Sequence, residues 1–278
     1  MDTVLGCDVS HWEGEIDWSR MRPAGAHFVF VKVSQGNWRD ARFAANWQGA
    51  RDAGLLRGGY MFYDYRYSPA VNLDTFRAAL KDDPGELPPA VDIEPISGVP
   101  MPSQRNMIAA LEPIIKGLAD WRGRAPLVYS NPATWFYLRP LPQWLTDCPL
   151  WIAHYRVSNP SVPSEFGDWR FWQWTDRMDG PRFGTASKQI DGDYWNGTLD
   201  ELRAWAGVVK PAPDPEPQPE PQPEPRPVPQ PVPQPRPVPP PPVLTLDEMV
   251  RRLWAAHPEL HDPPRKPVRR LYLPDVRA

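Results

Sequence analysis

The 278-residue chain has little cysteine, little net charge and no long apolar run, and each of these absences excludes a class of protein. Its two cysteines, Cys7 and Cys148, are too few for a disulfide framework or a thiolate metal cluster, and their apolar neighbours predict buried thiols. A formal net charge of -3 makes nucleic acid a poor partner. No apolar run reaches the roughly 20 residues that a membrane span needs, so no span is expected.

Signals for export, nucleotides and metals are also missing from the sequence. No charged segment followed by an apolar one resembles a secretory leader, so we expect synthesis in a cytoplasm without classical export. No Gly-x-Gly-x-x-Gly or P-loop sequence indicates a nucleotide. His11 and His154 lack the ligand spacing of a zinc site and are interpreted as structural histidines. We therefore expect neither a cofactor nor a metal.

Proline, by contrast, is abundant, and its 40 residues are unevenly distributed. Most lie between Pro211 and Pro242, where they alternate with charged or polar residues and valine, a pattern typical of a polyproline II spacer. The composition therefore predicts a folded domain of residues 1–209, a linker of residues 210–243 and a tail of residues 244–278.

The tail carries a capping-box sequence at residues 245–248, followed by apolar residues at helical spacing. This pattern predicts a short amphipathic helix. Because a lone helix of this length is marginal in water, we expect it to dock on a cell-wall or protein partner. Self-association and a weakly functional tail are the alternatives.

Short apolar segments alternate with helical ones through residues 1–209, which predicts an α/β fold with a parallel sheet or barrel. The expected strands are residues 4–9, 28–33, 58–63, 88–93, 126–130, 150–154, 171–174 and 188–191. The expected helices are residues 41–54, 70–80, 103–121, 132–138 and 198–205. Because helices are missing between the last strands, an incomplete (β/α) barrel is favoured over an open doubly wound sheet, and chemistry is expected at the carboxyl ends of its strands.

Two carboxylates, Asp92 and Glu94, stand at the end of the fourth expected strand. Their i, i+2 spacing places both side chains on one face, about 6.5–7 Å apart along the backbone. Paired carboxylates are the apparatus of glycoside cleavage, in which one acts as the acid, and a neighbouring negative charge raises a carboxyl pKa. Taken alone, the pair has a second interpretation, an acidic strand end that caps a helix or faces solvent.

An ordered series of motifs extends this pair into a family resemblance. The matching segments are residues 6–12 (GCDVSHW), 16–18 (IDW), 30–36 (FVKVSQG), 59–62 (GYMF), 91–94 (VDIE), 128–131 (VYSN), 150–155 (LWIAHY), 172–174 (WQW), 190–193 (IDGD) and 196–199 (NGTL). With them, residues 4–206 resemble glycoside hydrolase family 25, the Chalaropsis-type lysozymes. Met61 departs from the family, whose members often have histidine there.

The resemblance implies a TIM-like (β/α)5(β)3 barrel that hydrolyses the β-1,4 bond between N-acetylmuramic acid and N-acetylglucosamine in peptidoglycan. It carries an acidic site onto Asp8, Asp92, Glu94 and Asp191. We expect Glu94 to be the general acid, and Asp92 and Asp191 to stabilise the transition state or the substrate's 2-acetamido group. Asp191 is preferred over Asp193 because Ile190 precedes it as a strand residue.

Aromatic and polar residues at the ends of the expected strands are candidates for substrate binding. They are Tyr60, Phe62, Tyr63, Tyr129, Trp151, Tyr155, Gln173 and Trp174. Sugar sites use aromatic rings as stacking platforms, and the 14 tryptophans of this chain are many for its length. Core packing is the alternative for each ring.

The expected partner is a peptidoglycan glycan strand, and the expected setting is a phage endolysin made in the host cytoplasm that reaches the cell wall after release. A virion-associated lysozyme is the alternative setting. The alternative functions are a barrel that binds peptidoglycan without cutting it and a glycosidase for chitin-like polymers.

Overall fold

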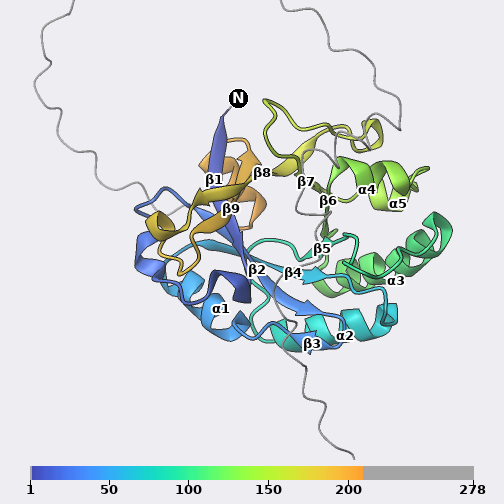
Figure 1. The fold of residues 1–278 in the computed structure, drawn as a ribbon, viewed down its shortest axis with the longest axis horizontal. Helices are drawn as coiled ribbons and strands as arrows, with labels where there is room; N and C mark the ends of the chain where they lie inside the picture. Colours follow the sequence, from blue (N-terminus) through green and yellow to red (C-terminus); the bar gives the residue numbers. More distant parts are fainter. Residues whose placement is uncertain (1, 209–278) are drawn as a thin grey trace, which may run out of the picture. The chain divides into compact units, whose positions relative to one another are not determined.

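Eight strands close into a barrel in the computed structural model, which describes residues 2–208 (Figure 1). In order around the barrel they are β1 (Thr3–Val9), β2 (Phe28–Gln35), β4 (Leu56–Phe62), β5 (Ala90–Asp92), β6 (Leu127–Ser130), β7 (Leu150–Ala153), β8 (Trp169–Asp179) and β9 (Gln189–Asn196). Pairing of β1 with both β2 and β9 closes the ring. The predicted linker and tail, residues 210–243 and 244–278, lie outside the described residues.

The strand directions confirm the α/β barrel and add one reversal. Every neighbouring pair from β1 through β2 and β4 to β8 is parallel, whereas β9 runs antiparallel to both β8 and β1. A short ninth strand, β3 (Trp38–Arg39), pairs with β2 alone as a hairpin. The carboxyl ends of the parallel strands therefore share one mouth, and β9 enters the barrel from that mouth.

Within residues 2–208, the five predicted helices are present, together with a four-residue helix, Gln143–Thr146, that the sequence did not predict. They are α1 (Phe43–Asp52), α2 (Pro69–Leu80), α3 (Gln104–Arg122), α4 (Pro132–Tyr137), α5 (Gln143–Thr146) and α6 (Leu199–Trp205). The predicted N-cap Ser103 accepts a hydrogen bond from the backbone of Asn106. Between β7 and β9 the described chain forms only 3-10 helices, so the expected loss of helices from the last third is confirmed. The connection from β1 to β2 likewise holds only 3-10 helices.

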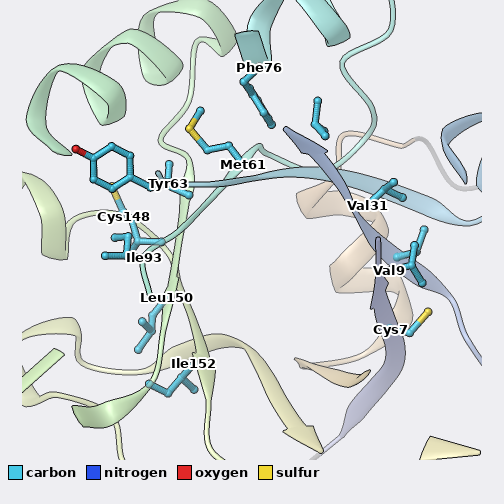
Figure 2. Close-up of a cluster of buried hydrophobic side chains, with 14 of the residues drawn as sticks. Cys7, Val9, Val31, Met61, Tyr63, Phe76, Ile93, Cys148, Leu150 and Ile152 are labelled. Atoms are coloured by element: carbon cyan, nitrogen blue, oxygen red, sulfur yellow. The ribbon is translucent and has the colours of Figure 1, made fainter. Parts of the chain in front are cut away.

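The core has two layers, because side chains alternate across each strand. The inner layer is an aromatic plug in which the ring centroids of Phe30 and Trp151 stack at 4.3 Å. Gly58 makes room for it, since a Cβ there would lie 2.3 Å from the Phe30 ring. The outer layer, shown in Figure 2, packs the other strand face against the helices and buries both cysteines as predicted.

Within residues 2–208, no helix combines the length and the apolar character that crossing a membrane requires.

Candidate active site

Four carboxylates meet at the mouth of the barrel. Asp8 lies near the end of β1, Asp92 ends β5, Glu94 follows two residues later, and Asp191 lies opposite Asp8 on β9. Their charges act on one another: Asp8 and Glu94 both raise the pKa of Asp191, and Glu94 and Asp8 raise that of Asp92. The structure therefore brings together all four acidic residues that the sequence singled out.

Gln173 of β8 connects this cluster to two tyrosines. Its amide nitrogen donates to Asp8 Oδ2 at 2.6 Å and to Asp191 Oδ2 at 3.1 Å. Its amide oxygen accepts the hydroxyl groups of Tyr129 at 2.7 Å and Tyr155 at 2.5 Å. A primary amide has two N–H groups and two acceptor lone pairs, so Gln173 is fully used. It fixes the positions of two carboxylates and two rings at once.

Asp193 is a fifth carboxyl, and its role was missed by the sequence reasoning. It lies opposite Gly6 on β1, deeper in the barrel than Asp191, because β9 runs downward from the mouth. Asp193 is fully buried and accepts the indole N–H of Trp151 at 2.8 Å. After the larger effect of burial, the charge of Asp193 also raises the pKa of Asp8. The Asp-Gly-Asp sequence was the only signal for it.

Burial dominates the electrostatics of the mouth. Desolvation is the largest cause that raises the pKa of Asp8, Asp92 and Glu94, and it raises the pKa of Asp191 to about 9. It also raises the pKa of Asp193 to about 7. The cluster therefore holds protons at neutral pH, as a site that must supply a general acid requires.

Two further charged groups modify this cluster. Lys32 faces inward from β2, is buried, and donates to Gln35 Oε1 at 3.0 Å. Its positive charge opposes the rise in the pKa of Asp92 and of Glu94. Glu13, which accepts the backbone N–H of Ser10 at 2.6 Å, adds a negative charge that raises the pKa of Asp8 and Asp191. Ser10 and Glu13 form a capping box, which is visible in the sequence.

The predicted substrate-binding residues divide by the face of the strand on which they lie. Tyr60, Tyr129 and Trp151 belong to the inner cluster, with the half-buried Tyr155 packed against it. Trp151 is only 2% exposed and stacks on Phe30, so it forms the floor of the site rather than a platform for a sugar. Phe62 lies beside Lys32 at the mouth, with its ring centroid 4.9 Å from Nζ.

The structure places Tyr63 and Trp174 on the outer face of the barrel, apart from the other predicted substrate residues. Tyr63 follows β4 on the outer face and lies with Met61 in the outer hydrophobic layer (Figure 2). Trp174 also packs on the outer layer, where its ring stacks on Tyr194 at 5.3 Å. Both residues directly follow an inward-facing one, so strand alternation turns them away from the mouth.

Both histidines that the sequence analysis interpreted as structural make hydrogen bonds within the protein. His11 Nδ1 lies 2.6 Å from Asp40 Oδ2, and His154 Nδ1 accepts the backbone N–H of Ser161 at 2.9 Å. Across residues 2–208, no three His, Cys, Asp or Glu side chains are grouped as metal ligands. A cavity of about 510 Å³ lies near the starts of β7 and β8, lined among others by Leu150, Trp169 and Trp205, and the carboxylates have no part in it.

A closed barrel whose mouth carries a cluster of protonatable carboxylates defines a glycosidase-like enzyme. The family model of the glycosyl hydrolases family 25 matches residues 7–182, and the chain belongs to this family. It is accordingly a glycoside hydrolase.

Individual relatives agree with this assignment. The chain is 32% identical over 226 residues to the uncharacterized protein YegX of Escherichia coli strain K12, covering 76% of each chain. It is 32% identical over 217 residues to lysozyme M1 of Streptomyces globisporus, covering 73% of this chain and 71% of the relative. Among solved structures, it is similar to the bacterial lysozyme of Streptomyces coelicolor, with a TM-score of 0.67 and 30% identity over 74% of this chain and 98% of the other.

Proposed function

We propose that the protein is a muramidase that hydrolyses the β-1,4 bond between N-acetylmuramic acid and N-acetylglucosamine in peptidoglycan. The observation that carries the proposal is the cluster of Asp8, Asp92, Glu94 and Asp191 at one barrel mouth, in a family-25 glycoside hydrolase. Relatives named lysozyme or N,O-diacetylmuramidase, such as that of Chalaropsis, support the choice of substrate.

Glu94 is assigned as the general acid. Burial raises its pKa, which favours the protonated form that an acid needs, while the charge of Lys32 opposes that rise. Its proton moves to the glycosidic oxygen as the bond from that oxygen to C1 breaks, and positive charge develops on the sugar ring. A water molecule then adds to C1 and returns a proton to Glu94, which closes the cycle with atoms in balance.

Asp92 is assigned to the 2-acetamido group of the sugar. Its Oδ1 atom is buried and has no hydrogen-bond partner within residues 2–208, so a donor from the substrate removes an unsatisfied acceptor. An acetamido N–H held there directs the carbonyl oxygen of the same group toward C1. Asp191, across the mouth, is assigned to stabilise the positive charge of the ring through a carboxyl oxygen that Gln173 orients, and Asp8 holds Gln173 in place.

The experiment compares wild type with Glu94→Gln in the clearing of purified peptidoglycan. The isosteric amide cannot donate the acid proton, so we expect the rate to fall by about 10²- to 10⁴-fold. Glu112→Gln is the matched control, because Glu112 lies on α3 and pairs with Lys116 at 2.6 Å. New reducing ends on muramic acid identify the bond that is cut.

Each alternative function has its own result in this experiment. If neither protein clears the wall but both sediment with it, the barrel binds glycan without cutting it. Faster release of products from chitin oligosaccharides than from peptidoglycan indicates a chitin-type glycosidase. Equal clearing by wild type and Glu94→Gln contradicts the assignment of the acid.

The setting in a phage endolysin stays a prediction, as does its virion-associated alternative. An endolysin that needs a separate membrane protein for release leaves intact host cells unharmed when it is made inside them, and lyses them after chloroform treatment. Lysis without permeabilisation contradicts that setting while leaving the muramidase proposal intact.

A further inference from the structure

A large aromatic ring stands in solvent beside the mouth, outside the site described above. Trp12 is 77% exposed, more than any other large apolar side chain within residues 2–208. It lies in the 3-10 helix His11–Glu13, which follows the strand that carries Asp8. Exposing so much indole to water is unfavourable, and such rings mark binding sites when the local structure holds them in place.

The turn beneath Trp12 holds the ring firmly. Its backbone N–H donates to Ser10 Oγ at 3.2 Å, and its ring lies against the His11 ring, with centroids 4.5 Å apart. His11 is in turn anchored to Asp40, whose side chain is fully buried, through Nδ1 at 2.6 Å and the backbone N–H at 3.3 Å. Little conformational entropy is therefore lost when a ligand packs on the indole.

A continuous row of side chains connects this ring to the carboxylates. The edge of His11 faces Trp38 of β3 at 6.3 Å, and Lys32 Nζ lies 5.4 Å from the Trp38 ring. The same Nζ lies 4.9 Å from the Phe62 ring, and its charge acts on Asp92 and Glu94. Trp38 is itself 38% exposed. The row thus runs from Phe62 and Lys32 at the mouth through Trp38 of β3 to His11 and Trp12.

We propose that Trp12, with Trp38 beside it, forms a distal subsite on which the same glycan strand packs a second sugar ring. This proposal rests on the proposed function. A pyranose ring presents a face of C–H groups that packs on a flat indole, whereas its rim of hydroxyl and acetamido groups stays in water. Lys32 supplies a positive charge on the side of this surface nearest the mouth, and the Asp40 carboxylate behind His11 is fully buried. Trp12 and Trp38 are also separate from the substrate residues predicted from the sequence, which lie on or just after β4, β6, β7 and β8.

The test measures kcat/KM of wild type and Trp12→Ala on a short peptidoglycan tetrasaccharide and on long glycan strands freed of peptides. Stacking on one aromatic ring is worth about 0.5–1.5 kcal/mol, so we expect the ratio of long-strand to tetrasaccharide kcat/KM to fall about threefold to tenfold. Trp12→Phe keeps an aromatic face and is expected to restore most of the ratio. Phe136→Ala is the matched control, because Phe136 is 60% exposed on α4, next to a strand four places from β1 around the barrel.

The outcomes separate this proposal from the muramidase proposal. If wild type cleaves neither substrate, the proposed function fails. If wild type cleaves both and Trp12→Ala leaves the ratio unchanged, only the subsite fails. An equal loss on both substrates also overturns it, because the ring then supports the mouth itself. A change from dimer to monomer in Trp12→Ala, seen by sedimentation, assigns the ring to contact between two copies instead.

Discussion

Gln173 uses all the hydrogen-bonding capacity of one amide to hold two carboxylates and two tyrosines. Gln173→Glu keeps the shape of the side chain but replaces two N–H donors by an acceptor oxygen. It adds a further acidic group to a buried acidic cluster, where an unsatisfied polar group costs about 1–3 kcal/mol. We expect a lower melting temperature at pH 7 and a rate of peptidoglycan hydrolysis reduced by about tenfold or more.

Gln48→Glu is the control for this substitution. Gln48 is exposed on α1 and donates to Asp52 at 2.7 Å, so the same chemical change happens beside a carboxylate in water. There, screening by solvent leaves only a small effect on stability. Equal melting temperatures for the two variants, measured by calorimetry, contradict the idea that Gln173 organises the mouth.

At the scale of strands and helices, the sequence predicts element type well because the apolar pattern reports burial directly. Choosing candidate residues only because they lie at the end of a strand ignores which face of the strand each side chain occupies. Gly58 and Tyr60 face inward on β4, so strict alternation already places Tyr63 outward. The strand-end criterion counted it as a substrate residue and ignored its phase.

The direction of β9 is a different kind of limit. A parallel eighth strand places the second acid of Asp-Gly-Asp nearer the mouth, whereas the antiparallel strand buries Asp193 beneath Asp191. The direction of a strand depends on whether the preceding loop crosses the barrel. The residues that connect β8 to β9 carry no pattern that predicts this. β8 is also longer than predicted, since it continues through bulges at Thr175 into polar residues that lack the apolar signal.

An ion network joins elements at the start of β4 and allows a test of packing away from the mouth. Arg57 is 3% exposed, donates to Asp83 at 2.8 and 3.0 Å and to Glu86 at 3.1 and 2.7 Å, and lies over the Trp47 ring. Arg57→Met removes the guanidinium that both carboxylates share, so Asp83 keeps only Arg51 at 3.6 Å and the Trp47 indole N–H, and Glu86 keeps only the backbone N–H of residue 57. We expect a loss of about 2–4 kcal/mol in the free energy of unfolding, measured by urea denaturation.

Lys116→Met provides the comparison for Arg57→Met. The Lys116–Glu112 pair has a similar distance, 2.6 Å, but its lysine is 62% exposed, so about 0–1 kcal/mol is expected. A loss in Arg57→Met no larger than that in Lys116→Met means that the network does not hold α1 and the loop before β5 onto the barrel.

At the scale of the whole molecule, the buried carboxyl groups of the mouth lower the stability of the folded state at pH values where an unfolded chain would ionise them. Burial raises the pKa of Asp193 to about 7 and that of Asp191 to about 9, whereas the pKa of an aspartate in an unfolded chain is about 3.9. The folded state therefore retains protons that the unfolded state has lost. Each group's stability contribution is complete below about pH 4 and is lost as pH rises through its folded pKa. The mouth accordingly destabilises the fold most at neutral and alkaline pH.

Asp193→Asn separates this electrostatic cost from the packing of the site. Asparagine keeps an acceptor oxygen for Trp151, so that contact survives while one titrating group disappears. We expect the melting temperature of the variant, relative to wild type, to rise between pH 4 and pH 8 by about 3 °C or more. Asp120→Asn, an exposed carboxyl at the end of α3, is expected to follow wild type at every pH. A difference that stays constant from pH 4 to pH 8 means that Asp193 does not gain a proton on folding, and the raised pKa of this group is then contradicted.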